Sequence, residues 1–142
     1  TKRIPANIIL KTMQFINKNY NCKFFLATGK DDDEQKILKE ILNSNMSASC
    51  IPLDNLKIYD ILPIIKNCNI SICNDTSFSH LSAALGLNTI VMMADTPIIY
   101  GSYSSKMHPI IPDGEKTVTH NTLGKNKINP EKIFLKFKDI IN

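Results

Sequence analysis

Short apolar runs alternate with amphipathic stretches along the whole chain, and this alternation limits the folds open to it. The apolar runs are typical of buried strands and stand at residues 22–28, 48–53, 69–74, 88–94 and, as a shorter fifth strand, 108–112. Between them the spacing predicts helices over residues 5–19, 32–42, 56–68 and 76–86, and a last helix after Asn129-Pro130. Pro63 should kink or divide the third of these helices.

Strands that alternate with helices in this way predict βαβ units, with a parallel sheet, helices on both faces and right-handed crossovers. We therefore expect an α/β fold, a Rossmann-like three-layer sandwich, that occupies residues 1–142 as one domain. In such folds ligands bind beyond the carboxyl ends of the strands. Those ends fall at residues 29–30, 53–56, 74–77 and 94–97.

Composition narrows the classes of function. The formal net charge of +4 fits anionic partners such as nucleotides, and without a long basic run it argues against a nucleic-acid surface. No apolar stretch is long enough to span a membrane and no signal peptide is visible. We therefore expect a cytoplasmic protein. Because the chain begins at Thr1 and not at Met, we also expect a processed or excised piece.

The cysteines and the acidic run are the two places in the sequence that resemble metal sites. None of the four cysteines, Cys22, Cys50, Cys68 and Cys73, forms a CxxC pair, which predicts reduced, buried thiols. Asp31 to Asp33 contain an Asp-x-Asp pattern, but their place at a helix start favours capping. We expect neither a metal nor a cofactor.

The segment from Ile70 to Pro97 holds the candidate binding residues. A buried strand ends at Asn74-Asp75, and a helix capped by Thr76 or Ser77 begins at once. The free N–H groups of a helix N-terminus favour a phosphate, and the hydroxyls of Thr76, Ser77 and Ser79 add donors. His80 lies close enough to reach a bound anion, and Asp75 suits hydrogen bonds to sugar hydroxyls. The alternatives are simple helix capping and a packed or surface histidine.

This segment, "NDTSFSHLSAALGLNTIVMMADTP", resembles the donor-site signature of glycosyltransferase family 9, the ADP-heptose–lipopolysaccharide heptosyltransferases. Asp75, Thr76 and His80 match the pattern, whereas Ser77 replaces a glycine and residues 94–96 replace a Gly-Pro-Thr turn. Upstream, Lys2, Arg3 and Pro5 match a Lys-Arg-Trp-Pro segment, with Ile4 in place of Trp. The resemblance runs from Lys2 to the end of the chain.

The resemblance implies the C-terminal, donor-binding half of a two-domain GT-B fold. It implies that Lys2 contacts the donor diphosphate, that Asp33 binds ribose hydroxyls and that the backbone of Leu56 reads the adenine edge. It also implies that Thr76 and Ser77 contact the donor phosphates, that Asp75 contacts the sugar, and that His80 contacts a phosphate or the sugar. The alternatives are a frayed terminal lysine at Lys2, helix-start charge at Asp33 and core packing at Leu56.

By the same resemblance the full-length protein transfers a sugar, with inversion, from an ADP-heptose-like donor to a lipopolysaccharide or lipid-linked acceptor. It acts in the cytoplasm, with peripheral association at the inner membrane. The general base belongs to an N-terminal acceptor domain absent from this chain, so its catalytic residues stay unknown and the chain alone should be inactive.

Two other readings remain open. One is a non-catalytic nucleotide-binding module of the same fold, which the substitutions at Ser77 and Asp95 favour. The other is a different α/β protein, such as a flavodoxin-like or phosphatase-like domain. A phosphate loop after the first strand and a Gly-x-Ser-x-Gly elbow are both absent from the sequence, which weighs against flavodoxin-like proteins and esterases.

Overall fold

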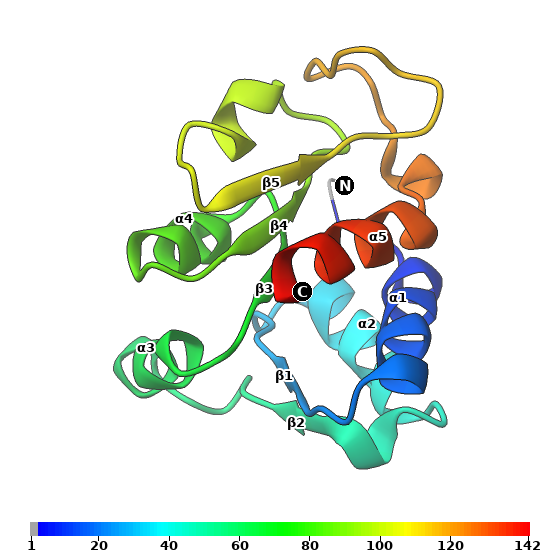
Figure 1. Ribbon diagram of the computed structural model, residues 1–142. Coiled ribbons are helices and arrows are strands. Elements are labelled where there is room, and N and C mark those ends of the chain that lie inside the picture. Colours follow the sequence, from blue (N-terminus) through cyan, green and yellow to red (C-terminus); the bar gives the residue numbers. More distant parts are fainter. Residues whose placement is uncertain (1–2) are drawn as a thin grey trace.

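The computed structural model describes residues 3–142 as an α/β fold in which helices and strands alternate (Figure 1). The strands are β1 (Phe24–Leu26), β2 (Cys50–Pro52), β3 (Ser71–Asn74), β4 (Thr89–Met92) and β5 (Met107–Ile110). The helices are α1 (Ala6–Asn19), α2 (Asp32–Leu42), α3 (Ile58–Lys66), α4 (Ser77–Ala84) and α5 (Pro130–Ile141). Short 3-10 turns stand at η1 (Ser47–Ser49), η2 (Ile98–Gly101) and η3 (Lys125–Lys127).

All strand pairs between these elements are parallel, as the sequence predicts. β1 pairs with β2, with Phe24 opposite Cys50. β4 lies between β3 and β5, with Ser71 opposite Thr89 and Thr89 opposite Met107. The strands are divided, however, between a two-stranded and a three-stranded sheet, and β1 does not pair with β3.

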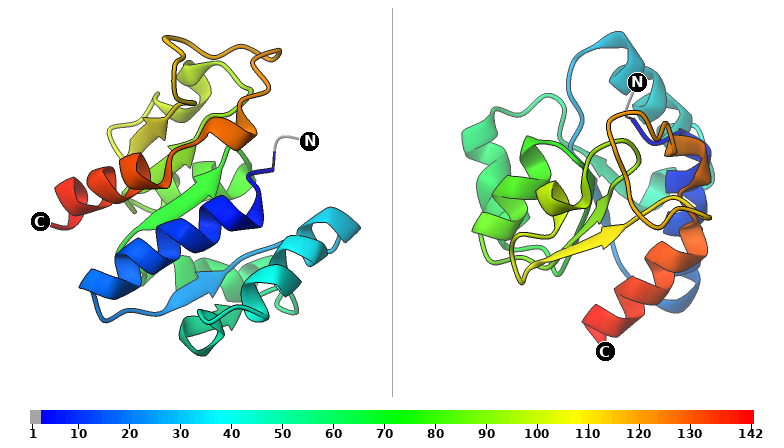
Figure 2. Two further views of the ribbon diagram at one scale, coloured as in Figure 1. Left: turned by 90° about the vertical axis from the view of Figure 1, so that its right-hand side faces the viewer. Right: turned by 90° about the horizontal axis from the view of Figure 1, so that it is seen from above.

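Helices cover both faces of the strand layer, which confirms the predicted three-layer arrangement (Figure 2). β4 is buried throughout and shows how the layers meet. Ile90 and Met92 pack with α1 and α5 on one face, whereas Val91 packs toward α4 on the other. α2 joins α1 on the first face through Met13 and Ile41. α3 packs on the second face together with Phe78 and Leu87.

Local sequence signals fix several helix ends. The side chain of Asn129 accepts a hydrogen bond from the Glu131 amide, and Pro130 occupies the first turn of α5. Gly86 has φ of +83° and follows α4, where the Leu87 amide bonds back to the Ser82 carbonyl at 3.0 Å. This is the glycine-terminated helix end that the sequence predicts.

Of the two expected effects of Pro63, a kink or a division, the structure excludes the division, because α3 continues from Ile58 to Lys66. Proline in a helix removes the hydrogen bond to the carbonyl four residues earlier, here that of Tyr59. Tyr59 is 81% exposed, so water can satisfy its carbonyl in place of the missing amide.

The cysteines are free thiols, as predicted, but they are half-buried where the prediction was buried thiols. Burial still raises the pKa of each thiol. At Cys73, hydrogen bonds with Ser71 and Ser82 offset part of this rise in the pKa. None of the helices described for residues 3–142 is long and apolar enough to cross a membrane.

Candidate functional site

The carboxyl ends of the parallel strands collect the candidate residues at one edge of the strand layer. Asp33 follows β1, Leu56 follows β2, and Asp75 to His80 follow β3. Because parallel strands end at the same edge, residues that are distant in the sequence share this edge. Lys2 lies outside the described residues, so its role stays a prediction.

The junction between β3 and α4 is built as the sequence predicts, with one difference. Thr76 occupies the capping position in an extended conformation, with φ of −144° and ψ of 175°, but its side chain caps no amide. Thr76 and Ser77 are both exposed, and the first turn of α4 has no acidic residue. The first amides of the helix therefore face outward with the positive end of its dipole.

Ser77 needs no glycine-like backbone. Within residues 3–142, Leu123 is the one non-glycine residue with positive φ, so Ser77 enters α4 with an ordinary helical backbone. Replacing the family's glycine by serine thus keeps the amide N–H at this position.

Ser79 does not offer its hydroxyl to a ligand, contrary to our expectation. Its side chain is fully buried, and its hydroxyl donates to the Thr76 carbonyl at 2.7 Å. The Ser79 amide bonds to the same carbonyl at 3.1 Å. Ser79 therefore closes the first turn of α4 and leaves Ser77 and Thr76 as the exposed hydroxyls.

His80 stands between an acid and a phenol. Its Nε2 lies 3.8 Å from Asp75 Oδ1, and its Nδ1 lies 2.5 Å from the Tyr103 hydroxyl. The two rings are stacked, with centroids 5.6 Å apart and planes inclined by 11°. The His80 side chain is 41% exposed, whereas that of Asp75 is 18% exposed. The Tyr103 hydroxyl thus holds the imidazole at Nδ1, whereas Nε2 lies beyond hydrogen-bond distance of Asp75 and is the nitrogen that can meet a ligand.

Tyr103 could not be predicted from the sequence. It lies between η2 and β5, in a polar stretch with no helical or strand period, and it meets His80 only because the chain returns over α4. The one signal available was an aromatic residue in a long loop that follows a strand end.

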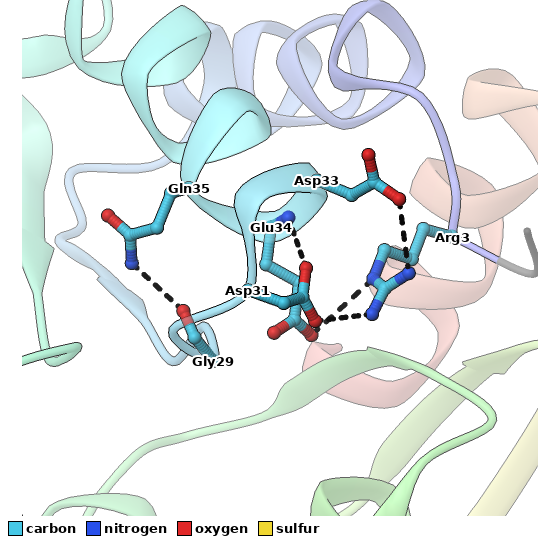
Figure 3. A network of polar contacts seen from close by, with 6 residues as sticks. All are labelled: Arg3, Gly29, Asp31, Asp33, Glu34 and Gln35. Atoms are coloured by element: carbon cyan, nitrogen blue, oxygen red, sulfur yellow. Dashed lines mark hydrogen bonds and ion pairs between the residues drawn. The ribbon is translucent and has the colours of Figure 1, made fainter.

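Asp33 lies in an ion-pair cluster at the start of α2, shown in Figure 3. The Arg3 guanidinium lies 2.5 Å from Asp31, 3.7 Å from Asp33 and 3.7 Å from Glu34. The Glu34 amide donates to Asp31, and this bond, followed by the charge of Arg3, lowers the pKa of the Asp31 carboxyl. Asp33 is therefore partly engaged by Arg3 and stays exposed at the edge.

Gly29 approaches this cluster closely from the end of β1. A Cβ added there would lie 1.9 Å from the Glu34 carboxylate, and the Gly29 carbonyl accepts a hydrogen bond from Gln35 at 2.9 Å. The loop after β1 therefore folds tightly onto the first turn of α2, which sets the position of Asp33.

Leu56 is tied to the same region through its loop. The Gln35 amide lies 3.3 Å from Asp54, and Lys30 lies 3.2 Å from Asn55. Leu56 is 42% exposed, so it is no core residue. Its amide donates to the Leu53 carbonyl at 3.0 Å, which leaves its carbonyl oxygen as the backbone group that could face a base.

Asp95 holds a neighbouring loop. Its carboxylate accepts a hydrogen bond from the Leu123 amide at 2.9 Å, and the Gly124 amide bonds to the Ala94 carbonyl at 3.0 Å. A Cβ on Gly124 would lie 2.2 Å from Pro112. This acid therefore fixes the loop after β4 instead of adding an uncompensated charge to the edge.

The structure thus brings the candidates together in two groups, one around Asp75 and His80 and one around Asp33 and Leu56. A hollow of about 640 Å³ beside Arg3 and Asp33 lies between α1, α2 and η3 and does not reach the first group. Among residues 3–142, no cluster of three His, Cys, Asp or Glu side chains is arranged to hold a metal ion.

Residues 12–125 match a family described as glycosyltransferase family 9 (heptosyltransferase). The fold is similar to the structure of an ADP-heptose lps heptosyltransferase II from E. coli, with a TM-score of 0.74 and 19% sequence identity. That similarity covers 99% of this chain but 42% of the matched chain, so this chain spans less than half of that protein. No curated protein matches the chain.

Proposed function

Because the chain belongs to glycosyltransferase family 9, we propose that it forms the donor-binding half of an inverting sugar transferase whose donor is a nucleotide sugar such as ADP-heptose. The observation that supports this most is the junction of β3 and α4. Exposed Thr76 and Ser77, outward helix amides and a fixed His80 stand together there beside the carboxylate of Asp75.

The donor diphosphate lies at the start of α4. The amides of the first turn and the hydroxyls of Thr76 and Ser77 donate to phosphate oxygens, and the helix dipole favours their charge. His80 approaches the same oxygens or the sugar with its open edge. Asp75 accepts hydrogen bonds from sugar hydroxyls, because its own charge excludes it from binding phosphate.

The nucleoside lies toward the ends of β1 and β2. Asp33 binds the ribose hydroxyls and shares its carboxylate with Arg3. The Leu56 carbonyl faces the adenine edge. Lys2 adds a positive charge to the diphosphate.

These groups supply one part of the transfer. When the bond from the sugar to the diphosphate breaks, negative charge builds up on the leaving phosphate, and the N–H groups of α4 stabilise that charge. The acceptor hydroxyl also needs a general base, which we assign to the acceptor domain of the full-length protein. A lipopolysaccharide or lipid-linked acceptor, met at the cytoplasmic face of the inner membrane, fits such a two-domain enzyme.

Calorimetric titration of this chain with ADP and with UDP tests the proposal. We expect ADP to bind more tightly than UDP. The Asp75→Ala, His80→Ala double variant should weaken binding of ADP-heptose more than binding of ADP, because ADP lacks the sugar that Asp75 contacts. An Asp113→Ala variant, altered in the loop after β5, is a control that should bind ADP and ADP-heptose as the unaltered chain does.

Two outcomes would count against parts of the proposal. If a folded chain binds neither nucleotide, the donor site is not formed by these residues. If the chain binds ADP, yet the full-length protein containing it transfers no sugar to any lipopolysaccharide acceptor, the chain is a nucleotide-binding module without turnover.

A further inference from the structure

The two ring nitrogens of His80 have different neighbours. Nδ1 lies 2.5 Å from the hydroxyl oxygen of Tyr103, within hydrogen-bond distance, whereas Nε2 lies 3.8 Å from Asp75 Oδ1, beyond it. A neutral imidazole carries its proton on one nitrogen only, and the hydrogen bond at one nitrogen sets the state of the other. The neighbours of His80 therefore determine whether Nε2, the nitrogen left for a ligand, donates or accepts.

The loop that carries Tyr103 is fixed on both sides of this residue. Before it, the backbone of Gly101 passes so close to β4 that an added Cβ would lie 2.5 Å from the sulfur of buried Met93. After it, the Ser104 hydroxyl accepts a hydrogen bond from the Lys106 amide at 3.1 Å. The Tyr103 ring is also nearly parallel to the imidazole, with planes inclined by 11°. The hydroxyl is thus held at Nδ1 before any ligand arrives.

Two arrangements of protons satisfy this hydrogen bond. In the first, the Tyr103 hydroxyl donates to Nδ1 and the ring proton is on Nε2. In the second, Nδ1–H donates to the Tyr103 oxygen and Nε2 carries a lone pair. A phenol is a better donor than acceptor, because its oxygen lone pairs are delocalised into the ring, and an imidazole nitrogen is a strong acceptor. The hydrogen bond with Tyr103 therefore favours the first arrangement.

Asp75 favours the same arrangement from the other side of the ring. Its carboxylate lies 3.8 Å from Nε2, and its side chain is 18% exposed, so water screens its charge only in part. A lone pair on Nε2 is repelled by this negative charge, whereas an N–H is attracted to it. When the imidazole is doubly protonated, both nitrogens carry a proton and the Tyr103 oxygen accepts from Nδ1. Nε2 is therefore a donor in either charge state.

We propose that Tyr103 is a positioning residue that keeps Nε2 of His80 protonated, so that His80 acts in the site as a hydrogen-bond donor and not as a base. The ligand of this donor rests on the proposed function: it is a phosphate or sugar oxygen of the nucleotide sugar at the start of α4. Neutral His80 then has no lone pair on Nε2 with which to deprotonate an acceptor hydroxyl, and its N–H instead stabilises charge on the leaving phosphate.

NMR of the ring nitrogens tests this assignment without any nucleotide. At about pH 9 an ordinary histidine is neutral, so the nitrogen shifts of the ¹⁵N-labelled chain report which ring nitrogen carries the proton. We expect the proton of His80 on Nε2. In Tyr103→Phe the share of the Nδ1–H form should rise about two- to tenfold, the effect of one net hydrogen bond on an equilibrium. Tyr103 is 57% exposed, so phenylalanine fits there without repacking. Tyr100→Phe, altered in the same loop, is the control and should leave the ratio unchanged.

ADP titration of a double variant tests whether Tyr103 acts through His80. Glutamine at position 80 places N–H donors about as far from the backbone as Nε2 and has no tautomers. Tyr103→Phe should weaken ADP binding about two- to fivefold when His80 is present and leave it unchanged in the His80→Gln background.

Two results would overturn the proposal. One is a His80 ring that carries its proton mainly on Nδ1 in the unaltered chain. The other is an equal ratio of the two forms in Tyr103→Phe and in the unaltered chain. If the chain binds no nucleotide, the proposed donor site fails, and the ring-nitrogen signals still decide the role of Tyr103.

Discussion

Replacing Ser77 by proline separates a backbone contact at the start of α4 from the fold that presents it. Ser77 is the first helical residue, and proline is favoured at that position because its φ is already helical and its N–H is not needed by the helix. Thr76 before it is extended, as a residue preceding proline should be. The variant therefore keeps the helix and removes one donor from the proposed phosphate site.

The size of the effect follows from the kind of bond that is lost. A hydrogen bond to a charged group contributes about 1.5–3 kcal/mol, so removing one that binds phosphate should weaken ADP binding roughly 10- to 150-fold. Ser77→Ala removes the hydroxyl and keeps the amide, and Ser77→Gly restores the residue found in the family pattern. Both variants lack the hydroxyl and keep the amide, so we expect each to lose only about two- to fivefold in ADP affinity, less than Ser77→Pro.

Calorimetric titration with ADP, paired with thermal unfolding of each variant, measures both quantities. Ser77→Pro should unfold at or slightly above the temperature of the unaltered chain, since proline restricts the unfolded state. A folded Ser77→Pro variant that binds ADP as tightly as Ser77→Gly would refute the reasoning, because the amide of residue 77 would then not contact the phosphate.

Three further predictions concern the surroundings of the site. Tyr103→Phe keeps the ring stacked on His80 but removes the hydroxyl that contacts it. We expect ADP affinity to fall about two- to fivefold, and Tyr100→Phe is a control that should leave it unchanged. An unchanged ADP titration of Tyr103→Phe would exclude a positioning role for the hydroxyl. Gly86→Ala forces a side chain into φ of +83°, where no neighbouring atom interferes, so thermal unfolding should report a loss of about 1–2 kcal/mol from the backbone alone. Arg3→Gln should raise the pKa of Asp31 in an NMR titration while leaving it below its usual value, because the Glu34 amide still donates to it. Since the folded-state pKa of Asp31 is lowered, its stabilising contribution is present above the unfolded pKa and is lost as the pH falls through the folded pKa, and Arg3→Gln should weaken this dependence.

Helix boundaries were predicted well where side chains near the helix end determine them. α2 runs from Asp32 to Leu42 as expected, because the Asp31 carboxylate accepts the Glu34 amide at 2.9 Å and so starts the helix. Asn129 and Pro130 start α5 in the same local way. These signals lie within a few residues of the helix end, so a single sequence contains them.

Strand lengths and pairing were predicted less well, because they depend on distant neighbours. The short apolar run 22–28 predicts a buried strand, yet β1 is limited to Phe24–Leu26, where β2 offers partners on one side only. The division of the strands into two sheets follows from which strands find partners, and no period in the sequence reports that.

The candidate site likewise contains residues that the sequence predicts and contacts that it does not. Thr76, Ser77 and His80 follow a strand within a few residues, so their shared position could be predicted. The contact of His80 with Tyr103 spans 23 residues and that of Arg3 with Asp31 spans 28, and both depend on how loops return over the strand ends. Ser79 was misassigned because sequence shows a hydroxyl but not that it points into the core.

Charge at the two ends of the site favours one orientation of a bound nucleotide. Among residues 3–142, the start of α2 holds Asp31, Asp33 and Glu34 in ion pairs with Arg3, so acidic groups outnumber the guanidinium there. The start of α4 has no acid in its first turn. A diphosphate is therefore repelled from α2 and attracted to α4, which directs the ribose toward Asp33. Pyrophosphate alone should then shift NMR signals of Ser77 and Phe78, and adenosine alone those of Asp33 and Leu56; the reverse pattern would contradict this orientation.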